Sequence, residues 1–264
     1  MTPSLRTIFP AVLAGAVLVP SVADAAVTST RSATKIAKAI ASKPSFVRSA
    51  SWVTLSPRGR PAAVSTSKLV GFPRSGNSYG VLSTGDATAI DDPNDENDLS
   101  HSNGPRSRVV RGTRDTVILK VNVNVPRGAN CLSVRFRFLS EEFDEFVGTE
   151  FNDGFLAEIG PSTWSSKSGD PAIKSPNNFA FDRERKRITV NSVGDFSVTS
   201  DRAKGTTYDA GTRRLRASTP VKPGSRTVHF SIFDQGDRQF DSTVVLDALN
   251  ATRRIPCKGG ALLD

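Results

Sequence analysis

Hydrophobic and polar residues alternate with a period of two along much of the chain. The positions that share one face fall into four runs: Val117, Leu119, Val121, Val123 and Val125; Leu132, Val134, Phe136 and Phe138; Val228, Phe230 and Ile232; and Val244, Leu246 and Ala248. Successive side chains of a strand point to opposite faces, so each run predicts a strand with one buried face. Linkers rich in Pro, Gly, Asn and Asp separate the runs and favour turns. We therefore expect an all-β fold, an antiparallel β-sandwich or jelly roll, without the alternation of strands and helices that gives parallel sheets.

The first 25 residues depart from this pattern. One charge, Arg6, precedes an apolar run from Ile8 to Val19, and small residues ending in Ala23-Asp24-Ala25 follow. This arrangement is typical of a secretory signal peptide with its cleavage site. A transmembrane anchor is the weaker interpretation, because spanning a bilayer takes about 20 apolar residues. We expect residues 1–25 to be a signal peptide and the mature chain to be secreted or held at the cell surface.

Residues 26–264 are expected to form a single domain. Residues 32–41 carry apolar positions at helical spacing, with Ser32 or Thr34 available as the N-cap, and predict one short N-terminal helix. No internal repeat or shift in composition marks a boundary, and no later stretch reaches transmembrane length. A hydrophobic content of 37% is enough for a substantial core.

The two cysteines fit an oxidising compartment. Cys131 opens a predicted strand and Cys257 lies near the end of the chain, and neither has the C-x-x-C context of a redox or metal site. In an exported chain we expect them to form a disulfide, which would close a loop of about 125 residues and stabilise the fold. Two free, buried thiols are the alternative.

Acidic residues gather in three clusters at the ends of predicted strands. The first lies between Asp91 and Asp98, the second comprises Glu141, Glu142 and then Asp153, and the third comprises Asp234, Asp237 and Asp241. Calcium takes six to eight oxygen ligands in irregular geometry, so short acidic loops from neighbouring strands can share one ion. We expect the second and third clusters to meet and to bind calcium, although their spacing is not that of an EF-hand loop.

Two other interpretations of these carboxylates stay open. In the first, the carboxylates accept hydrogen bonds in turns or pair with arginines such as Arg238. In the second, they serve a hydrolase, because glycosidases use two carboxylates about 5–10 Å apart. Against catalysis, adjacent residues on a strand point to opposite faces. The only histidines, His101 and His229, accompany no nucleophile motif, and too few His and Cys residues exist for a zinc site.

The chain is basic, with 35 Lys and Arg against 26 Asp and Glu and a formal net charge of +9. Such a balance favours anionic partners. The densest basic run, residues 183–187, contains an acid and no aromatic residues, so it predicts a solvated turn before the strand Ile188-Thr189-Val190. Nucleic acid is an unlikely partner, whereas anionic wall polymer is a plausible one.

Four ordered segments resemble the choice-of-anchor L domain family of bacterial exported and surface proteins. They are residues 79–86 (YGVLSTGD), residues 138–155 (FLSEEFDEFVGTEFNDGF), residues 208–215 (YDAGTRRL, with one extra residue) and residues 232–242 (IFDQGDRQFDS). The second and fourth contain the acidic clusters and are the most specific. Together the segments cover nearly the whole mature chain.

The resemblance implies an extracellular β-rich module without established catalysis. We therefore expect a non-catalytic adhesion-type module that binds a surface polysaccharide or a protein. A secreted hydrolase of a cell-wall or environmental polymer is the first alternative, and a purely structural surface component is the second. The tail after Cys257 shows neither an apolar span nor a sorting motif, so we expect the protein to be released or held non-covalently.

Overall fold

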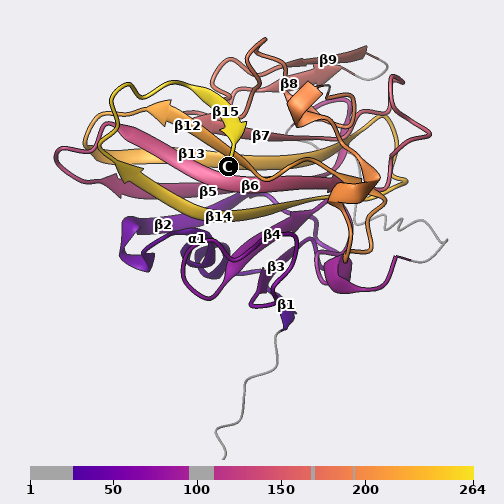
Figure 1. Cartoon of the computed structure of the whole chain (residues 1–264), viewed down its shortest axis with the longest axis horizontal. Coiled ribbons are helices and arrows are strands. Elements are labelled where there is room, and N and C mark those ends of the chain that lie inside the picture. Colours follow the sequence, from indigo (N-terminus) through magenta and orange to yellow (C-terminus); the bar gives the residue numbers. More distant parts are fainter. Residues whose placement is uncertain (1–25, 95–109, 168–169, 193) are drawn as a thin grey trace, which may run out of the picture.

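The protein consists of two antiparallel sheets packed face to face, with a small third sheet beside them (Figure 1). The computed structural model describes residues 26–94, 110–167, 170–192 and 194–264, so the predicted signal peptide lies outside the described residues. The larger sheet runs in the order β1 (Val27–Ser29), β3 (Ala62–Ser65), β4 (Tyr79–Ser83), β14 (Ser242–Thr252), β6 (Cys131–Ser140), β12 (Leu215–Pro220) and β15 (Gly260–Leu263), with β11 (Ala210–Gly211) beside β6. The predicted all-β sandwich is confirmed.

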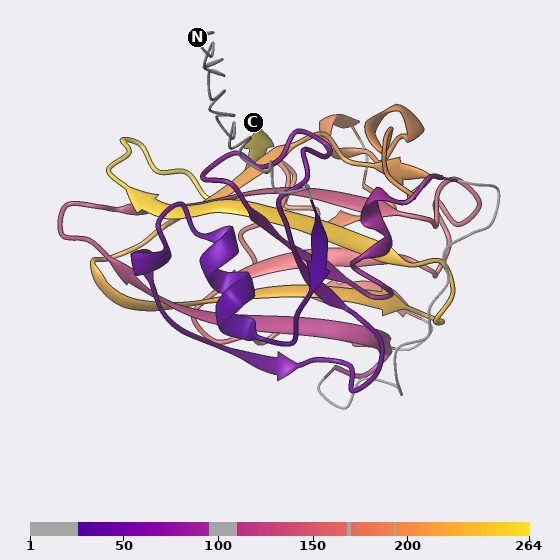
Figure 2. The same ribbon diagram turned by 90° about the horizontal axis from the view of Figure 1, so that it is seen from below.

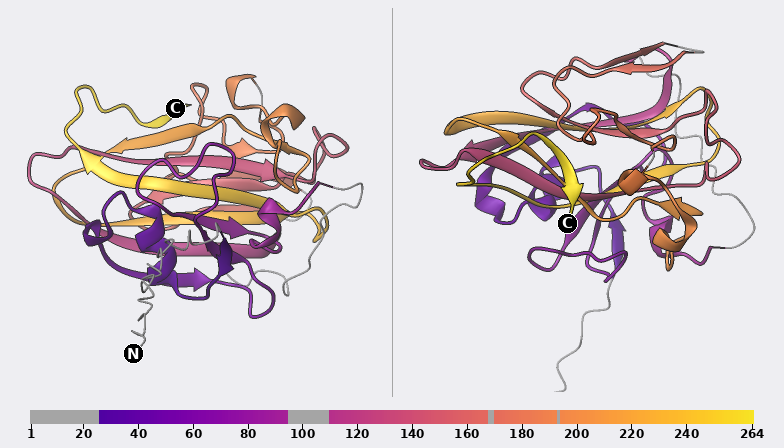
Figure 3. Two further views of the ribbon diagram at one scale, coloured as in Figure 1. Left: turned by 60° about the horizontal axis from the view of Figure 1, so that its bottom comes forward. Right: turned by 45° about the horizontal axis from the view of Figure 1, so that its top comes forward.

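The second sheet runs in the order β10 (Ile188–Thr189), β7 (Gly154–Ile159), β13 (Gly224–Gln235), β5 (Thr113–Val125) and β2 (Val47–Thr54). A hairpin of β8 (Ser165–Lys167) and β9 (Asp170–Lys174) lies outside the two sheets (Figure 3). Short 3-10 helices interrupt the loops at Pro44–Phe46, Ala89–Asp91, Gly194–Phe196 and Ser200–Arg202.

The core fills the space between the sheets with the side chains that the period-two pattern selects. The core contains the valines of β5, together with Leu132, Val134, Phe136 and Phe138 of β6 and Val228, Phe230 and Ile232 of β13. One predicted position is wrong. The pairing of β14 with β6 shifts register after Asp247, Ala248 adopts a positive φ of 53°, and Leu249 enters the main core in its place. A bulge of this kind cannot be read from alternation alone.

The single α-helix of the described residues, α1 (Ala33–Ile40), closes one side of the sandwich (Figure 2). Its N-cap Ser32 accepts a hydrogen bond from the Lys35 amide at 3.3 Å, which satisfies one of the free amides of the first turn. Ile36 and Ile40 face the core and approach Gly80 of β4 so closely that a Cβ there would lie 2.6 Å from Ile40. The helix therefore depends on glycine at residue 80 to seal the edge between the sheets.

Cys131 and Cys257 form a disulfide, with their Cα atoms 5.5 Å apart. This separation lies within the range that disulfides require. The bond joins the first residue of β6 to the segment between β14 and β15, and so ties the end of the chain to the middle of the larger sheet. None of the helices in the described part of the chain has the length and apolar character needed to cross a bilayer.

Candidate functional site

The strand ends that carry the second and third acidic clusters meet at one end of the sandwich. In the larger sheet, Ser242 at the start of β14 pairs with Ser140 at the end of β6. In the smaller sheet, the end of β13 pairs with Gly154 at the start of β7. Because β13 leads directly into β14, the loop between them crosses from one sheet to the other. The structure therefore brings together carboxylates that lie about 100 residues apart. We call this group the acidic end; it comprises Asp115, Glu141, Glu142, Asp153, Asp234 and Asp241.

Three carboxylates form the centre of the acidic end. Glu142 accepts a hydrogen bond from the Asp153 amide through Oε2 at 3.1 Å, and Asp153 accepts one from the Gln235 amide through Oδ1 at 3.1 Å. The side chains of Asp153 and Asp234 lie within hydrogen-bonding reach of each other. All three are buried, with exposures of 1%, 0% and 1% for Glu142, Asp153 and Asp234.

No cationic side chain of the described residues pairs with this centre. Neither Glu142, Asp153 nor Asp234 forms an ion pair with any Lys or Arg in the described ranges. Oδ2 of Asp153 and Oδ1 of Asp234 accept no hydrogen bond from a described residue. The hydroxyls of Ser242 and Thr84 lie close to Asp153 and Asp234 and partly offset the effect of burial on their pKa values, while Thr84 also donates to the Ser242 carbonyl at 3.2 Å.

Burial and mutual repulsion disfavour ionisation of these groups. Burial, followed by the charge of Asp153, raises the pKa of Glu142 to about 10. Burial, then the charge of Asp234, raises the pKa of Asp153 well above its usual value. The pKa of Asp234 rises in the same way, through burial and the charge of Asp115. Two carboxylate oxygens in contact need a proton or a cation between them, because both are acceptors when ionised.

Asp115 belongs to the acidic end but was not among the residues predicted from the sequence. Between the pairs Ile232–Val117 and Asp234–Arg114, the register shifts so that β5 carries an extra residue. Asp115 takes a positive φ of 41° in this bulge and is 3% exposed. Bulges re-aim side chains, and Asp is one of the residue types that tolerate this conformation. The only signal in the sequence is an acid just before an apolar strand.

The other predicted ligands lie around this centre. Asp241 is buried against Gly85, where an added Cβ would lie 1.7 Å from Asp241 Oδ2. Glu141 is 2% exposed. Burial, followed by the charges of Asp241 and Glu141, raises the pKa of Tyr208. Asp237 is half-buried at the rim, where it adds to the negative charge near Glu142. Of the first cluster, Asp91 accepts a hydrogen bond from Ser67 Oγ at 3.4 Å, and residues 95–98 fall outside the described residues.

A group of phenylalanine rings joins the two loops above the acidic end. Phe146 lies 5.5 Å from Phe151 in an edge-to-face contact and 4.9 Å from Phe240, measured between ring centroids. The first two rings come from the loop between β6 and β7, and the third comes from the loop between β13 and β14. Aromatic pairs at these distances stabilise the contact beyond their buried area. The two acidic loops are thus held together by packing as well as by hydrogen bonds.

This geometry limits the chemistry of the acidic end. Over the described ranges, no group of three or more His, Cys, Asp or Glu side chains is arranged to hold a metal ion. His101 lies outside the described residues, and His229 lies on β13 beside Lys120, where burial and then that charge lower its pKa. A buried carboxylate pair can share a proton, or it can take up a cation when the surrounding oxygens adjust.

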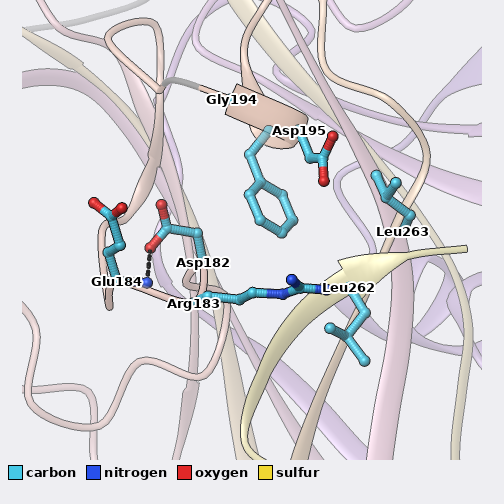
Figure 4. Close-up of a pocket in the computed structure, with 8 residues that line it drawn as sticks. Asp182, Arg183, Glu184, Gly194, Asp195, Leu262 and Leu263 are labelled. Atoms are coloured by element: carbon cyan, nitrogen blue, oxygen red, sulfur yellow. Dashed lines mark hydrogen bonds between the residues drawn. The ribbon is translucent and has the colours of Figure 1, made fainter.

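Open clefts lie on the surface at a different part of the fold. One, of about 420 Å³, lies between the turn after Phe181 and the edge strand β15, and its lining includes Arg183, Asp195, Leu262 and Leu263. Figure 4 shows Arg183 extending toward Leu262, while Asp182 accepts a hydrogen bond from the Glu184 amide at 2.9 Å. The run 183–187 thus forms the predicted turn before β10, and it separates this cleft from a second one.

The fold and the acidic end define an all-β sandwich domain whose clustered carboxylates are largely buried. The chain belongs to the choice-of-anchor L domain family, whose sequence profile matches residues 67–251, and the predicted resemblance is confirmed. No curated protein matches the chain.

Solved structures with some likeness to the chain are binding and adhesin domains. TmCBM61 in complex with beta-1,4-galactotriose is 9% identical with a TM-score of 0.31, covering 78% of this chain and 88% of its own. A cleaved adhesin domain of Lys-gingipain is 13% identical with a TM-score of 0.34, covering 77% and 87%. A second such domain, from Porphyromonas gingivalis, is 9% identical with a TM-score of 0.32, covering 77% and 95%. Likeness at this level does not establish a shared ligand or activity.

Proposed function

We propose that the protein is an exported, non-catalytic binding module of the bacterial cell surface, and that its acidic end binds calcium. The observation that carries the non-catalytic part is burial. Five of the six carboxylates that a hydrolase would use, Glu142 foremost, are at most a few per cent exposed, and Asp237 alone is half-buried at the rim, so a polymer cannot reach an acid and a base together. The family and the disulfide support an extracellular setting.

A binding screen and a hydrolysis assay test this proposal together. The full mature chain should bind a surface glycan or protein and release no product from cell-wall or environmental polymers. Hydrolysis that disappears in Glu142→Gln or Asp237→Asn would establish the hydrolase alternative instead. A chain that binds nothing across glycans and envelope proteins would leave the structural-component alternative.

The calcium part rests on the uncompensated centre of the acidic end. Asp153 and Asp234 lie within hydrogen-bonding reach of each other, one oxygen of each accepts no hydrogen bond from a described residue, and Glu142 adds a third carboxylate. Calcium, at the millimolar levels typical of weak extracellular sites, would bind these three groups with Glu141, Asp237 and Asp241 around them. It would neutralise the repulsion that a proton must otherwise relieve.

Thermal unfolding in calcium and in chelator tests the site. Calcium at 100 times its dissociation constant should stabilise the protein by about 2.7 kcal/mol. Glu158→Gln is the matched control, because Glu158 is a buried carboxylate whose partners are Ser162 and the Thr163 amide, away from the acidic end. The calcium shift should survive in this control and disappear in Asp153→Asn. An unchanged melting temperature, with no metal in the purified protein, would assign the contact to a shared proton.

A further inference from the structure

The turn that separates the two surface clefts presents two arginines to the second cleft, and a lysine from another segment faces the same cleft. Phe181 and Arg187 form an antiparallel bridge across this turn, and Asp182 holds it by accepting the Glu184 and Lys186 amides. The second cleft, of about 400 Å³, is lined by residues that include Lys174, Ser175, Phe181, Arg185 and Arg187. Lys174 comes from the end of β9, so two separate segments contribute the charge.

Both arginines are held in position. Arg187 donates through Nε to Ser175 Oγ at 2.8 Å, which fixes the plane of its guanidinium group. The Arg185 guanidinium carbon lies 4.4 Å from the centroid of the Phe181 ring. Arg185 also takes a positive φ of 64°, a conformation in which glycine is favoured. The turn therefore keeps a strained arginine where glycine would be relaxed.

The charge of this cleft is not neutralised by the protein itself. The one acid in the run, Glu184, pairs with Lys186 at 2.7 Å. In the described ranges, no carboxylate lies within ion-pair distance of Lys174, Arg185 or Arg187. The unpaired cations of the cleft contrast with the arginines on the outer face of the larger sheet, where Arg135 and Arg214 are both paired with Asp264.

We propose that the second cleft binds carboxylate groups of an acidic polysaccharide. A planar guanidinium matches a carboxylate with two parallel hydrogen bonds, and Lys174 adds a point charge from the opposite segment. The Phe181 ring is covered by Arg185, so the cleft offers no open ring for stacking of a nucleic-acid base. This inference rests on the proposed binding function and names its ligand class.

Binding of polygalacturonate to the full mature chain tests the inference, with calorimetry at 0.15 M salt as the readout. Arg185→Gly removes the guanidinium and leaves a residue suited to the positive φ, so the fold should stay intact and the unfolding midpoint checks this. Arg183→Ala is the matched control, because it removes one charge from the same turn but from the other cleft (Figure 4). Arg185→Gly and Lys174→Ala should each weaken binding about tenfold, the size expected for one charged hydrogen bond.

Several results would overturn the inference. Equal weakening by Arg183→Ala and Arg185→Gly would show that only net charge matters. Tighter binding to single-stranded DNA than to polygalacturonate would assign the cleft to a different polymer. A wild-type chain that binds neutral glycans or a protein, and not polygalacturonate, would refute the ligand class while leaving the proposed binding function intact.

Discussion

The acidic end and the last residue of the chain place buried carboxylates in opposite surroundings. Asp153 lies among other carboxylates, and burial with the charge of Asp234 raises its pKa. Asp264 lies against the outer face of the larger sheet, where Arg135 and Arg214 donate to its two oxygens at 2.7 and 2.9 Å. Burial opposes its ionisation too, but the hydrogen bonds from these arginines outweigh it and lower its pKa.

The difference shows that burial alone does not decide whether a carboxylate is ionised. Both carboxylates are nearly inaccessible, yet one has its charge matched by the protein and the other does not. A buried charge is tolerated when it is paired and hydrogen-bonded, and it otherwise takes up a proton or a counter-ion. Arginines of the chain itself match the charge of Asp264, whereas the carboxylates of the acidic end take up a proton or a cation from solution.

The largest effect is expected where the packing of the acidic end is broken. Gly85→Ala would place a Cβ 1.7 Å from the Oδ2 atom of Asp241, a side chain that is only 1% exposed, so something must shift. We expect a loss of about 2–3 kcal/mol in the free energy of unfolding, measured by denaturant titration. Gly259→Ala is the control beside β15, because its Cβ would make only an ordinary contact with Phe181 at 3.8 Å. Equal stability of the two variants would show that Asp241 is free to shift.

Neutralising the acidic end should have opposite effects with and without calcium. Asp234→Asn keeps the shape of the side chain and removes the carboxyl group, whose pKa is raised by burial. In chelator at pH 8 it should raise the free energy of unfolding by about 1–3 kcal/mol, because the wild-type carboxyl group is ionised in the unfolded chain and must take up a proton, or bury its charge, on folding. In calcium it should instead lower the melting temperature, because a ligand is lost. The same sign in both buffers would contradict a calcium site.

The sequence predicts the fold better than it predicts this site. Alternation places Phe136 and Val228 in the core because strands have a fixed period, and Ser32 marks the start of α1 because few residues cap well. The acidic clusters are visible at strand ends. Their contact depends on β14 pairing with β6, a long-range choice that no local pattern records. The bulge that brings in Asp115 is likewise set by the two sheets together.

Neutralising Asp264 should lower the free energy of unfolding, and the loss should be larger at neutral pH than at acidic pH. Asp264→Asn removes the charged acceptor of Arg135 and Arg214, and we expect a loss of about 1–2 kcal/mol at pH 7, reduced by the partial exposure of both arginines. The pKa of Asp264 lies below its usual value of 3.8 in the folded state, so the stabilisation is complete above pH 4 and is lost as the pH falls through the folded-state pKa. Denaturant titrations of wild type and variant should therefore show a smaller difference at pH 3 than at pH 7. A gap that stays constant would mean that the variant acts through packing.

The smallest effect is expected from the ion pair between Lys186 and Glu184, whose N···O distance equals that between Arg135 and Asp264. Lys186 Nζ lies 2.7 Å from Glu184 Oε2, the same separation as Arg135 Nε and Asp264 Oδ1, but these side chains are 55% and 70% exposed. Water already solvates both charges, and fixing two long side chains costs conformational entropy, so the pair gains little over its solvated state. Glu184→Gln should leave the unfolding midpoint unchanged at pH 7, while Asp264→Asn lowers it. Comparable losses in the two variants would show that distance rather than burial sets the strength of these pairs, and the contrast between the acidic end and Asp264 would then need another cause.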